Sequence, residues 1–150
     1  MALVFIKTQT ASSDTHIDFI NGTSDVVLDG TYNEYVFFVT NYKPVTDEKM
    51  LCFQVDTGTA TTYQQTITSA AFKAEMSSSG TLTLYAPSDG TYIKHFQSRF
   101  NTQYKSGSSV YMIDQQVGGY FHTTTALTRV RFAALSGSIL TGTFALYGVS

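Results

Sequence analysis

Histidine and acidic side chains come first, because at the right spacing they bind metals or transfer protons. His16 and Asp18 are two positions apart in an alternating stretch, so both point from one face of a strand and offer two metal ligands. A tight zinc site needs more ligands than this, and a third has no obvious local source. We therefore expect an exposed polar strand face here rather than a metal site.

The other reactive residues are isolated along the chain. His95 and His122 lie among aromatic residues, and we interpret each as a partly buried strand histidine. Cys52 is the single cysteine, so no intrachain disulfide forms, and its apolar neighbours indicate a small buried side chain. Nucleophile-elbow, phosphate-loop and calcium-loop patterns are absent. We expect no catalytic residue, no cofactor, no metal and no enzymatic activity.

Aromatic residues carry more information about function. The chain has 10 Tyr, 11 Phe and no Trp. Phe falls mostly at inward positions of alternating segments, whereas several Tyr fall beside turns or on outward faces. A tyrosine ring with its hydroxyl suits protein interfaces and stacking on sugar rings, although Tyr also simply caps sheet edges. The candidate interface or glycan-binding residues are Tyr32, Tyr42, Tyr63, Tyr85, Tyr104, Tyr111 and Tyr147.

The elements that must position these residues are strands. Alternating or continuously apolar segments cover residues 2–10, 15–20, 34–40, 50–56, 61–68, 81–86, 92–101, 110–122, 128–134 and 142–149. Residues 34–40 are apolar on both faces, which predicts a central strand covered on both sides. Residues 81–101 predict a hairpin around the turn sequence PSDG. The polar segment 61–68 is a candidate edge strand.

Turn signals separate these segments. We expect a turn at 11–14, a flexible break at 77–80, a loop at 105–109, and a bulge or sharp bend where Gly118 and Gly119 interrupt a strand. Residues 26–28 form either a short strand or one helical turn. Residues 69–76 are the only candidate for a short helix.

This pattern of roughly eight to ten short strands predicts an all-β fold, an antiparallel two-sheet β-sandwich of jelly-roll type with little or no helix. One domain spans residues 1–150. No segment alternates strands with long helices, so a parallel α/β fold is not expected.

The low content of charged residues limits which classes of function are expected. Only 13% of the residues are charged, and the formal net charge is −2. A surface of Thr, Ser, Asn, Gln and Tyr desolvates at little cost, which suits packed assemblies and sugar binding, although β-proteins are often Thr-rich in any case. Without a basic patch, we do not expect nucleic-acid binding. The apolar run at 3–6 is too short for a signal core or a membrane span, so we expect assembly in a cytoplasm and no membrane.

Several segments resemble small virion-associated proteins of tailed bacteriophages, notably phages of marine bacteria and cyanobacteria. They are LVFIKTQTASS at 3–13, YNEYVF at 32–37, KPVTD at 43–47, YIKHF at 92–96, GYFHTTTAL at 119–127, SGSI at 136–139 and GTFALYG at 142–148. Members of this family often have a longer middle region, and the segment from Gly58 to Tyr63 looks shortened here. The resemblance implies a place in a virus particle and supplies no catalytic residues.

Two functions compete on this basis. The first is a non-enzymatic virion structural protein, a decoration or cement protein on the capsid, assembled in the host cytoplasm. The second is a tail-fibre or receptor-binding component that holds a glycan of the host surface. The expected partners are other virion proteins of capsid or tail and further copies of the chain, with a trimer favoured by analogy with jelly rolls. A soluble hydrolase is a third class, which the missing catalytic pattern argues against.

Overall fold

The protein is described by a computed structural model over residues 1–58, 62–68 and 76–150. This part of the chain contains ten strands and no helix. The strands are β1 Leu3–Asp14, β2 Ile17–Ile20, β3 Glu34–Pro44, β4 Leu51–Asp56, β5 Thr62–Thr66, β6 Ser78–Tyr85, β7 Lys94–Ser106, β8 Ser109–Phe121, β9 Arg129–Ala134 and β10 Ile139–Val149. Among the residues described, no helix has the length and apolar character needed to cross a membrane.

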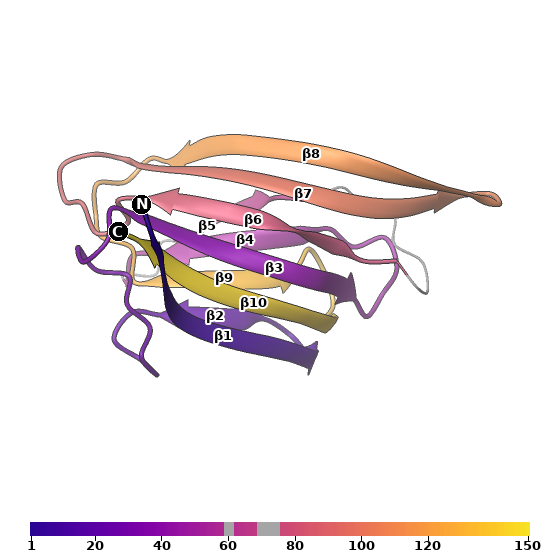
Figure 1. Cartoon of the computed structure of the whole chain (residues 1–150), viewed down its shortest axis with the longest axis horizontal. Coiled ribbons are helices and arrows are strands. Elements are labelled where there is room, and N and C mark those ends of the chain that lie inside the picture. The colour runs from indigo at the N-terminus through magenta and orange to yellow at the C-terminus, as the bar shows by residue number, and fades with distance from the viewer. Residues whose placement is uncertain (59–61, 69–75) are drawn as a thin grey trace.

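The strands form two antiparallel sheets that face each other (Figure 1). The large sheet has the order β1-β10-β3-β6-β7-β8, and the small sheet has the order β2-β9-β4-β5. If β7 and β8 are set aside, the remaining eight strands wrap back and forth between the sheets as in a jelly roll. The predicted all-β sandwich is confirmed, with β7 and β8 added as a hairpin at one edge of the large sheet.

Aromatic side chains fill the space between the sheets. The inward positions predicted for Phe19, Phe53, Phe132 and Phe144 are confirmed, since all four are fully buried. The ring of Phe37 joins them, with its centroid 5.2 Å from that of Phe19 and 5.3 Å from that of Phe132. Edge-to-face contacts of this kind add to the free energy gained from burial, so the two sheets are tightly coupled at their centre.

The β7–β8 hairpin is longer than the sandwich beneath it. Its far end projects past the other strands (Figure 1). There the rings of Tyr104 and Tyr111 stack with centroids 5.1 Å apart and planes 22° apart. Stacking between directly paired residues stiffens the part of the hairpin that extends past the other strands.

Three segments predicted to break the strands are in fact parts of strands. β1 continues through residues 11–14, where Asp14 pairs with Ile139. β6 starts at Ser78, inside the predicted flexible break. β8 runs through Gly118 and Gly119 with no shift of register against β7, so the predicted bulge is wrong.

Close packing explains two of the glycines in these strands, Gly80 and Gly119. A Cβ atom on Gly119 would lie 2.8 Å from the ring of Phe96, and a Cβ atom on Gly80 would lie 2.7 Å from Cα of Phe100. Both positions therefore need glycine so that an aromatic residue of β7 can lie against the neighbouring strand. In the sequence a glycine is also a signal of a turn or a flexible segment, which is why a break at Gly80 and a bulge at Gly119 were predicted.

Two further predictions need correction. Residues 26–28 form neither a strand nor a helical turn but a loop, which buries Val26 and Leu28. β3 is central, as predicted, but in the part of the chain that the structure describes no second layer lies over its outer face (Figure 1). The edge position of β5 is confirmed. The predicted helix at 69–76 falls almost entirely outside the described residues.

Candidate interaction surface

The outer face of the large sheet, which points away from the small sheet, carries two distinct surfaces. We call the first the apolar patch; it lies on β1, β10 and β3. Its residues are Leu3, Phe5, Val36, Phe38, Ala145, Tyr147 and Val149. We call the second the tyrosine groove; it lies on β6, β7 and β8. Its residues are Tyr85, His95, Gln97, Gln116, Gly118 and Tyr120.

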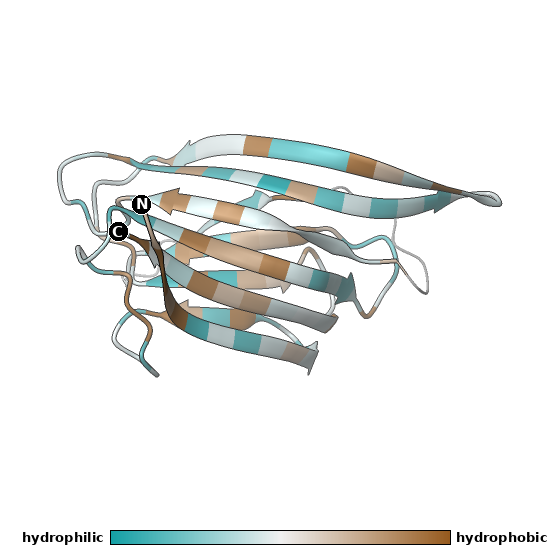
Figure 2. Cartoon of the chain, in the orientation of Figure 1, coloured by the Kyte–Doolittle hydropathy of each residue, from teal (hydrophilic) through white to brown (hydrophobic). Residues whose placement is uncertain are grey.

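Cross-strand pairing builds the apolar patch. Phe5 is opposite Tyr147, and Tyr147 is opposite Val36, so apolar side chains lie side by side across three strands. The ring of Tyr147 makes edge-to-face contacts with Phe5 at 5.5 Å and with Phe38 at 5.4 Å. In Figure 2 the hydrophobic segments of these strands lie next to each other near the chain ends.

The apolar patch is open to solvent at its edge. Leu3 is 52% exposed and Phe5 is 58% exposed, although both are large hydrophobic residues. Contiguous apolar surface on a folded protein marks a site of interaction far more often than scattered single residues do. We predicted that β3 is covered on both sides, but none of the described strands covers its apolar outer face.

The tyrosine groove is a shallow open hollow of about 550 Å³. Tyr85, His95 and Tyr120 occupy directly paired positions on three neighbouring strands and form a row of rings along one side. The next paired row holds Gln97 and Gly118, and the missing side chain of Gly118 creates the hollow. The groove thus combines aromatic rings with amide groups, and no Asp, Glu, Lys or Arg side chain lines it.

A buried lysine fixes the loops at the end of the groove. Lys94 has no exposed surface, and its ammonium group donates to the backbone carbonyls of Asp89, Tyr92 and Thr124. Burial lowers the pKa of Lys94, while the nearby carboxylate of Asp89 opposes this shift. Because one cation holds the loops before β7 and after β8, the position of the adjacent His95 is defined.

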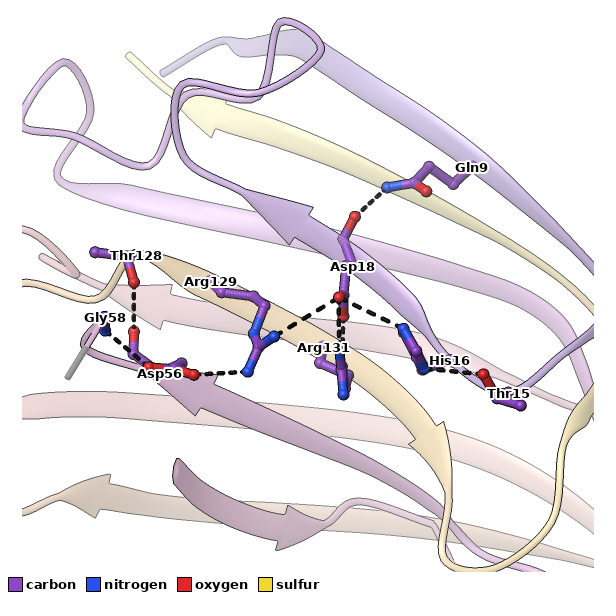
Figure 3. Close-up of polar contacts among 9 residues, drawn as sticks. All are labelled: Gln9, Thr15, His16, Asp18, Asp56, Gly58, Thr128, Arg129 and Arg131. Atoms are coloured by element: carbon purple, nitrogen blue, oxygen red, sulfur yellow. Dashed lines mark hydrogen bonds and ion pairs between the residues drawn. The ribbon is translucent and has the colours of Figure 1, made fainter. Parts of the chain in front are cut away.

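Charged residues gather instead on the outer face of the small sheet (Figure 3). Asp18 of β2 accepts two hydrogen bonds from Arg131 of β9, at 2.6 Å and 2.7 Å. Asp56 of β4 accepts one from Arg129 at 2.6 Å. Each pair is directly opposed across neighbouring strands, so these contacts tie β2, β9 and β4 together. Hydrogen bonding to Asp18 raises the pKa of the Arg131 guanidinium.

The ion pairs also involve His16 and Asp18, the two possible metal ligands of the sequence analysis. His16 Nε2 lies 3.6 Å from Asp18 Oδ2, as their spacing implied. Both oxygens of Asp18 already accept from Arg131, so the carboxylate stabilises the sheet. In the parts of the chain that the structure describes, no group of three or more His, Cys, Asp or Glu is placed to hold a metal ion.

The seven candidate tyrosines do not form one site. Tyr85 lines the tyrosine groove and Tyr147 lies in the apolar patch. Tyr104 and Tyr111 stack on the far end of the hairpin. Tyr42 is fully buried and its hydroxyl donates to the Lys49 carbonyl at 3.2 Å, so the expected surface position is wrong for this residue.

The remaining two candidates pack against the core. Tyr32 is half-buried, and its ring lies over Gly148, where a Cβ atom would collide with it. Tyr63 is also half-buried, with its ring centroid 5.7 Å from that of Phe121. Both rings thus cover the margin of the core and present only part of their surface.

Sequence reasoning missed two residues of the tyrosine groove. Tyr120 is 61% exposed and His95 lies beside it, with ring centroids 6.4 Å apart. The interpretation of His95 and His122 as partly buried is wrong, since both are exposed. Cys52 is buried, as predicted. In the structure His95 lies between the buried residues Lys94 and Phe96 and points outward, and strand pairing places it in one row with Tyr85 and Tyr120.

No family model matches this chain, and a search of curated proteins finds no matching sequence.

Proposed function

We propose that this protein is a non-catalytic structural component of a bacteriophage particle, a decoration or cement protein bound to the capsid surface. The observation that carries the proposal is the apolar patch on the outer face of the large sheet. The resemblance of residues 3–13 and 119–127 to virion-associated proteins of tailed phages, together with a chain that is only 13% charged, supports it.

The apolar patch is the docking face in this proposal, and its partner is a neighbouring capsid protein with an apolar, uncharged surface. Phe5 is the anchor, because it is the most exposed ring of the patch and lies on the edge strand β1. Burying apolar surface yields roughly 25 cal/mol per Å², and aromatic anchors commonly dominate such interfaces. Few charges need to lose their hydration on docking.

Copies of the chain also associate in this proposal, with a trimer favoured by analogy with other jelly rolls. A repeated arrangement on the particle multiplies weak contacts into stable binding. Light scattering of the purified protein tests the association, and a stable monomer at high concentration contradicts the trimer.

Substitution of the anchor tests the docking face. Phe5→Ser is expected to weaken binding to purified particles that lack the protein by about 100-fold, because aromatic hot spots contribute on the order of 3 kcal/mol. Its melting temperature should stay close to that of the original protein, since Phe5 is largely exposed. Tyr92→Ser is the matched control, because Tyr92 is 71% exposed and lies outside the apolar patch. Equal binding by both variants contradicts the proposed docking face.

A second candidate is a tail-fibre or receptor-binding component of the virion. The specific observation in its favour is the tyrosine groove, which combines rings and amides as sugar-binding sites do. Cryo-electron microscopy of the intact particle distinguishes the two candidates, because a decoration protein occupies the icosahedral lattice and a receptor-binding protein lies on the tail. Absence of density on the capsid rules out the first candidate.

A further inference from the structure

The tyrosine groove differs in chemistry from the other hollows of the described surface. The hollow between β1 and β2 has a volume of about 260 Å³ and is bordered by Lys7 and Asp18. The tyrosine groove is larger, at about 550 Å³, and its side chains are tyrosine, histidine and glutamine above a glycine floor. It also continues into a second hollow of about 270 Å³ that shares Gln97 and Gln116.

We propose that the tyrosine groove binds a neutral saccharide, with one sugar ring over Gly118 and Gln97 and a second ring in the adjoining hollow. This inference deepens the receptor-binding candidate by naming the residues and the ligand class. It depends on the tyrosine groove and not on the apolar patch, so either proposal can fail while the other stands.

The dimensions of the sheet suit a sugar ring. Neighbouring strands lie about 4.8 Å apart, and successive residues on one face of a strand lie about 7 Å apart. Tyr85, His95 and Tyr120 therefore form a wall about 10 Å long, beside a floor lowered by the missing side chain of Gly118. A pyranose ring fits against this wall with its apolar face on Tyr120, which is 61% exposed.

Amide and hydroxyl groups supply the directional contacts. The Tyr85 hydroxyl donates to Gln97 Oε1 at 3.4 Å, which orients the Gln97 amide so that its NH₂ group can donate to a sugar hydroxyl. Gln116 offers a second amide on the neighbouring strand. Thr81 and Thr83 line the adjoining hollow and offer hydroxyls that both donate and accept.

The charges nearby favour a neutral ligand over an anion. Arg99 borders the adjoining hollow, but its guanidinium donates to both oxygens of Asp114, with the shortest contact at 2.6 Å. This pairing lowers the pKa of the Asp114 carboxyl, so the pair stays ionised and locally balanced. Lys94 is buried and engaged with carbonyls, so it offers no positive charge to the groove.

Two variants test the site. Gly118→Val fills the hollow, and it suits the fold because the nearest atom to a Cβ there, the Phe96 carbonyl oxygen, is 3.8 Å away. Tyr120→Ala removes the exposed ring of the wall. Met112→Ala is the control, since Met112 lies on the same strand, is 65% exposed and does not line the groove.

The measurement is an NMR titration of the isotope-labelled protein with methyl glycosides of glucose, galactose and mannose and with disaccharides of these sugars, alongside an array of neutral and acidic glycans. We expect at least one neutral glycan to shift the amide signals of Gly118 and Tyr120. Both variants should weaken its binding by at least about tenfold, while Met112→Ala leaves it unchanged. Disaccharides should bind more tightly than single sugars.

Three results overturn the proposal. The first is that no glycan binds at millimolar concentration. The second is that binding survives in Tyr120→Ala, which decides the matter even if Gly118→Val fails to fold. The third is that only acidic glycans bind and that Arg99→Gln abolishes their binding, because the site would then recognise an anion.

Discussion

Lys94 shows how a single buried residue organises this protein. Its side chain is fully enclosed, and its ammonium group is a donor to carbonyls on both sides of the β7–β8 hairpin. A buried cation is unfavourable unless its protons are all engaged, and here backbone carbonyls take that role. The residue therefore acts as a clamp between two loops.

Replacement of the clamp is expected to lower stability strongly. Lys94→Met keeps an unbranched side chain but leaves the carbonyls of Asp89, Tyr92 and Thr124 without their donor. We expect a loss of about 3 kcal/mol in the free energy of unfolding, measured by urea denaturation. Lys105→Met is the control, because Lys105 is exposed on the same strand, and it should change stability by less than about 0.5 kcal/mol. Equal urea midpoints for Lys94→Met and Lys105→Met contradict this role of Lys94.

A buried tyrosine predicts how stability depends on pH. Burial raises the pKa of Tyr35 to about 12, and its hydroxyl donates to the Asp29 carbonyl at 2.7 Å. In the unfolded chain the same phenol loses its proton near pH 10, at about the ordinary tyrosine pKa. Its contribution to stability is therefore fully present below about pH 10 and is lost as the pH rises toward 12.

Unfolding by urea at a series of alkaline pH values tests this. The free energy of unfolding should fall above about pH 10, and Tyr35→Phe should make that fall shallower. Burial also raises the pKa of Tyr42, so part of the fall should remain in the variant. Tyr92→Phe, at an exposed position, serves as the comparison. The same slope for Tyr35→Phe and the original protein contradicts this account.

At the scale of elements, glycines set how closely β6 and β7 approach. Gly80 is directly opposite Phe100, and a Cβ atom there would collide with the Arg99 carbonyl oxygen as well as with Phe100. Gly80→Ala is therefore expected to cost about 3 kcal/mol, because backbone atoms must move. Gly90→Ala has no atom within 4 Å of the added carbon and should be nearly neutral. Thermal melting compares the two, and similar melting temperatures contradict this role of Gly80.

At the scale of the whole molecule, the chain ends meet within the large sheet. The amide of Ala2 donates to the Ser150 carbonyl at 3.0 Å, and the amide of Ser150 donates to the Ala2 carbonyl at 3.0 Å. Figure 1 shows both ends at the same side of the sandwich. The first and last strands, β1 and β10, are thus paired along one edge of the large sheet. The β7–β8 hairpin is an addition at the opposite edge.

A circular permutant tests this closure. Joining the ends with a short Gly/Ser linker and opening the chain after Gly107, at the hairpin turn, should preserve a cooperative unfolding transition, because no inter-sheet contact is cut. Opening the chain between Phe37 and Phe38, inside the central strand β3, should abolish folding. Circular dichroism and urea denaturation report both outcomes. Failure of the first permutant to fold contradicts the view that the hairpin is an addition.

The sequence by itself determined the fold class and much of the core. Period-two alternation in residues 51–56 and 129–134 identified two strands and their buried faces, because burial of one sheet face is a local property of each strand. It failed at Gly80 and Gly119, where the missing side chain makes room for a phenylalanine of β7, and at Gly118, where the strand continues without a bulge. It also placed Tyr42 at the surface, although the strand carries this ring into the core.

Only the tertiary structure decided which outward residues meet. Phe5 joins Tyr147, and Tyr85 joins Tyr120, through strand pairings between segments far apart in the chain. The order of strands in a sheet follows from how the whole chain wraps, and no local pattern encodes it. Alternation along one strand determines which face of the sheet a side chain lies on. The register between strands determines which other side chains lie beside it, and a binding surface is made of such neighbouring side chains.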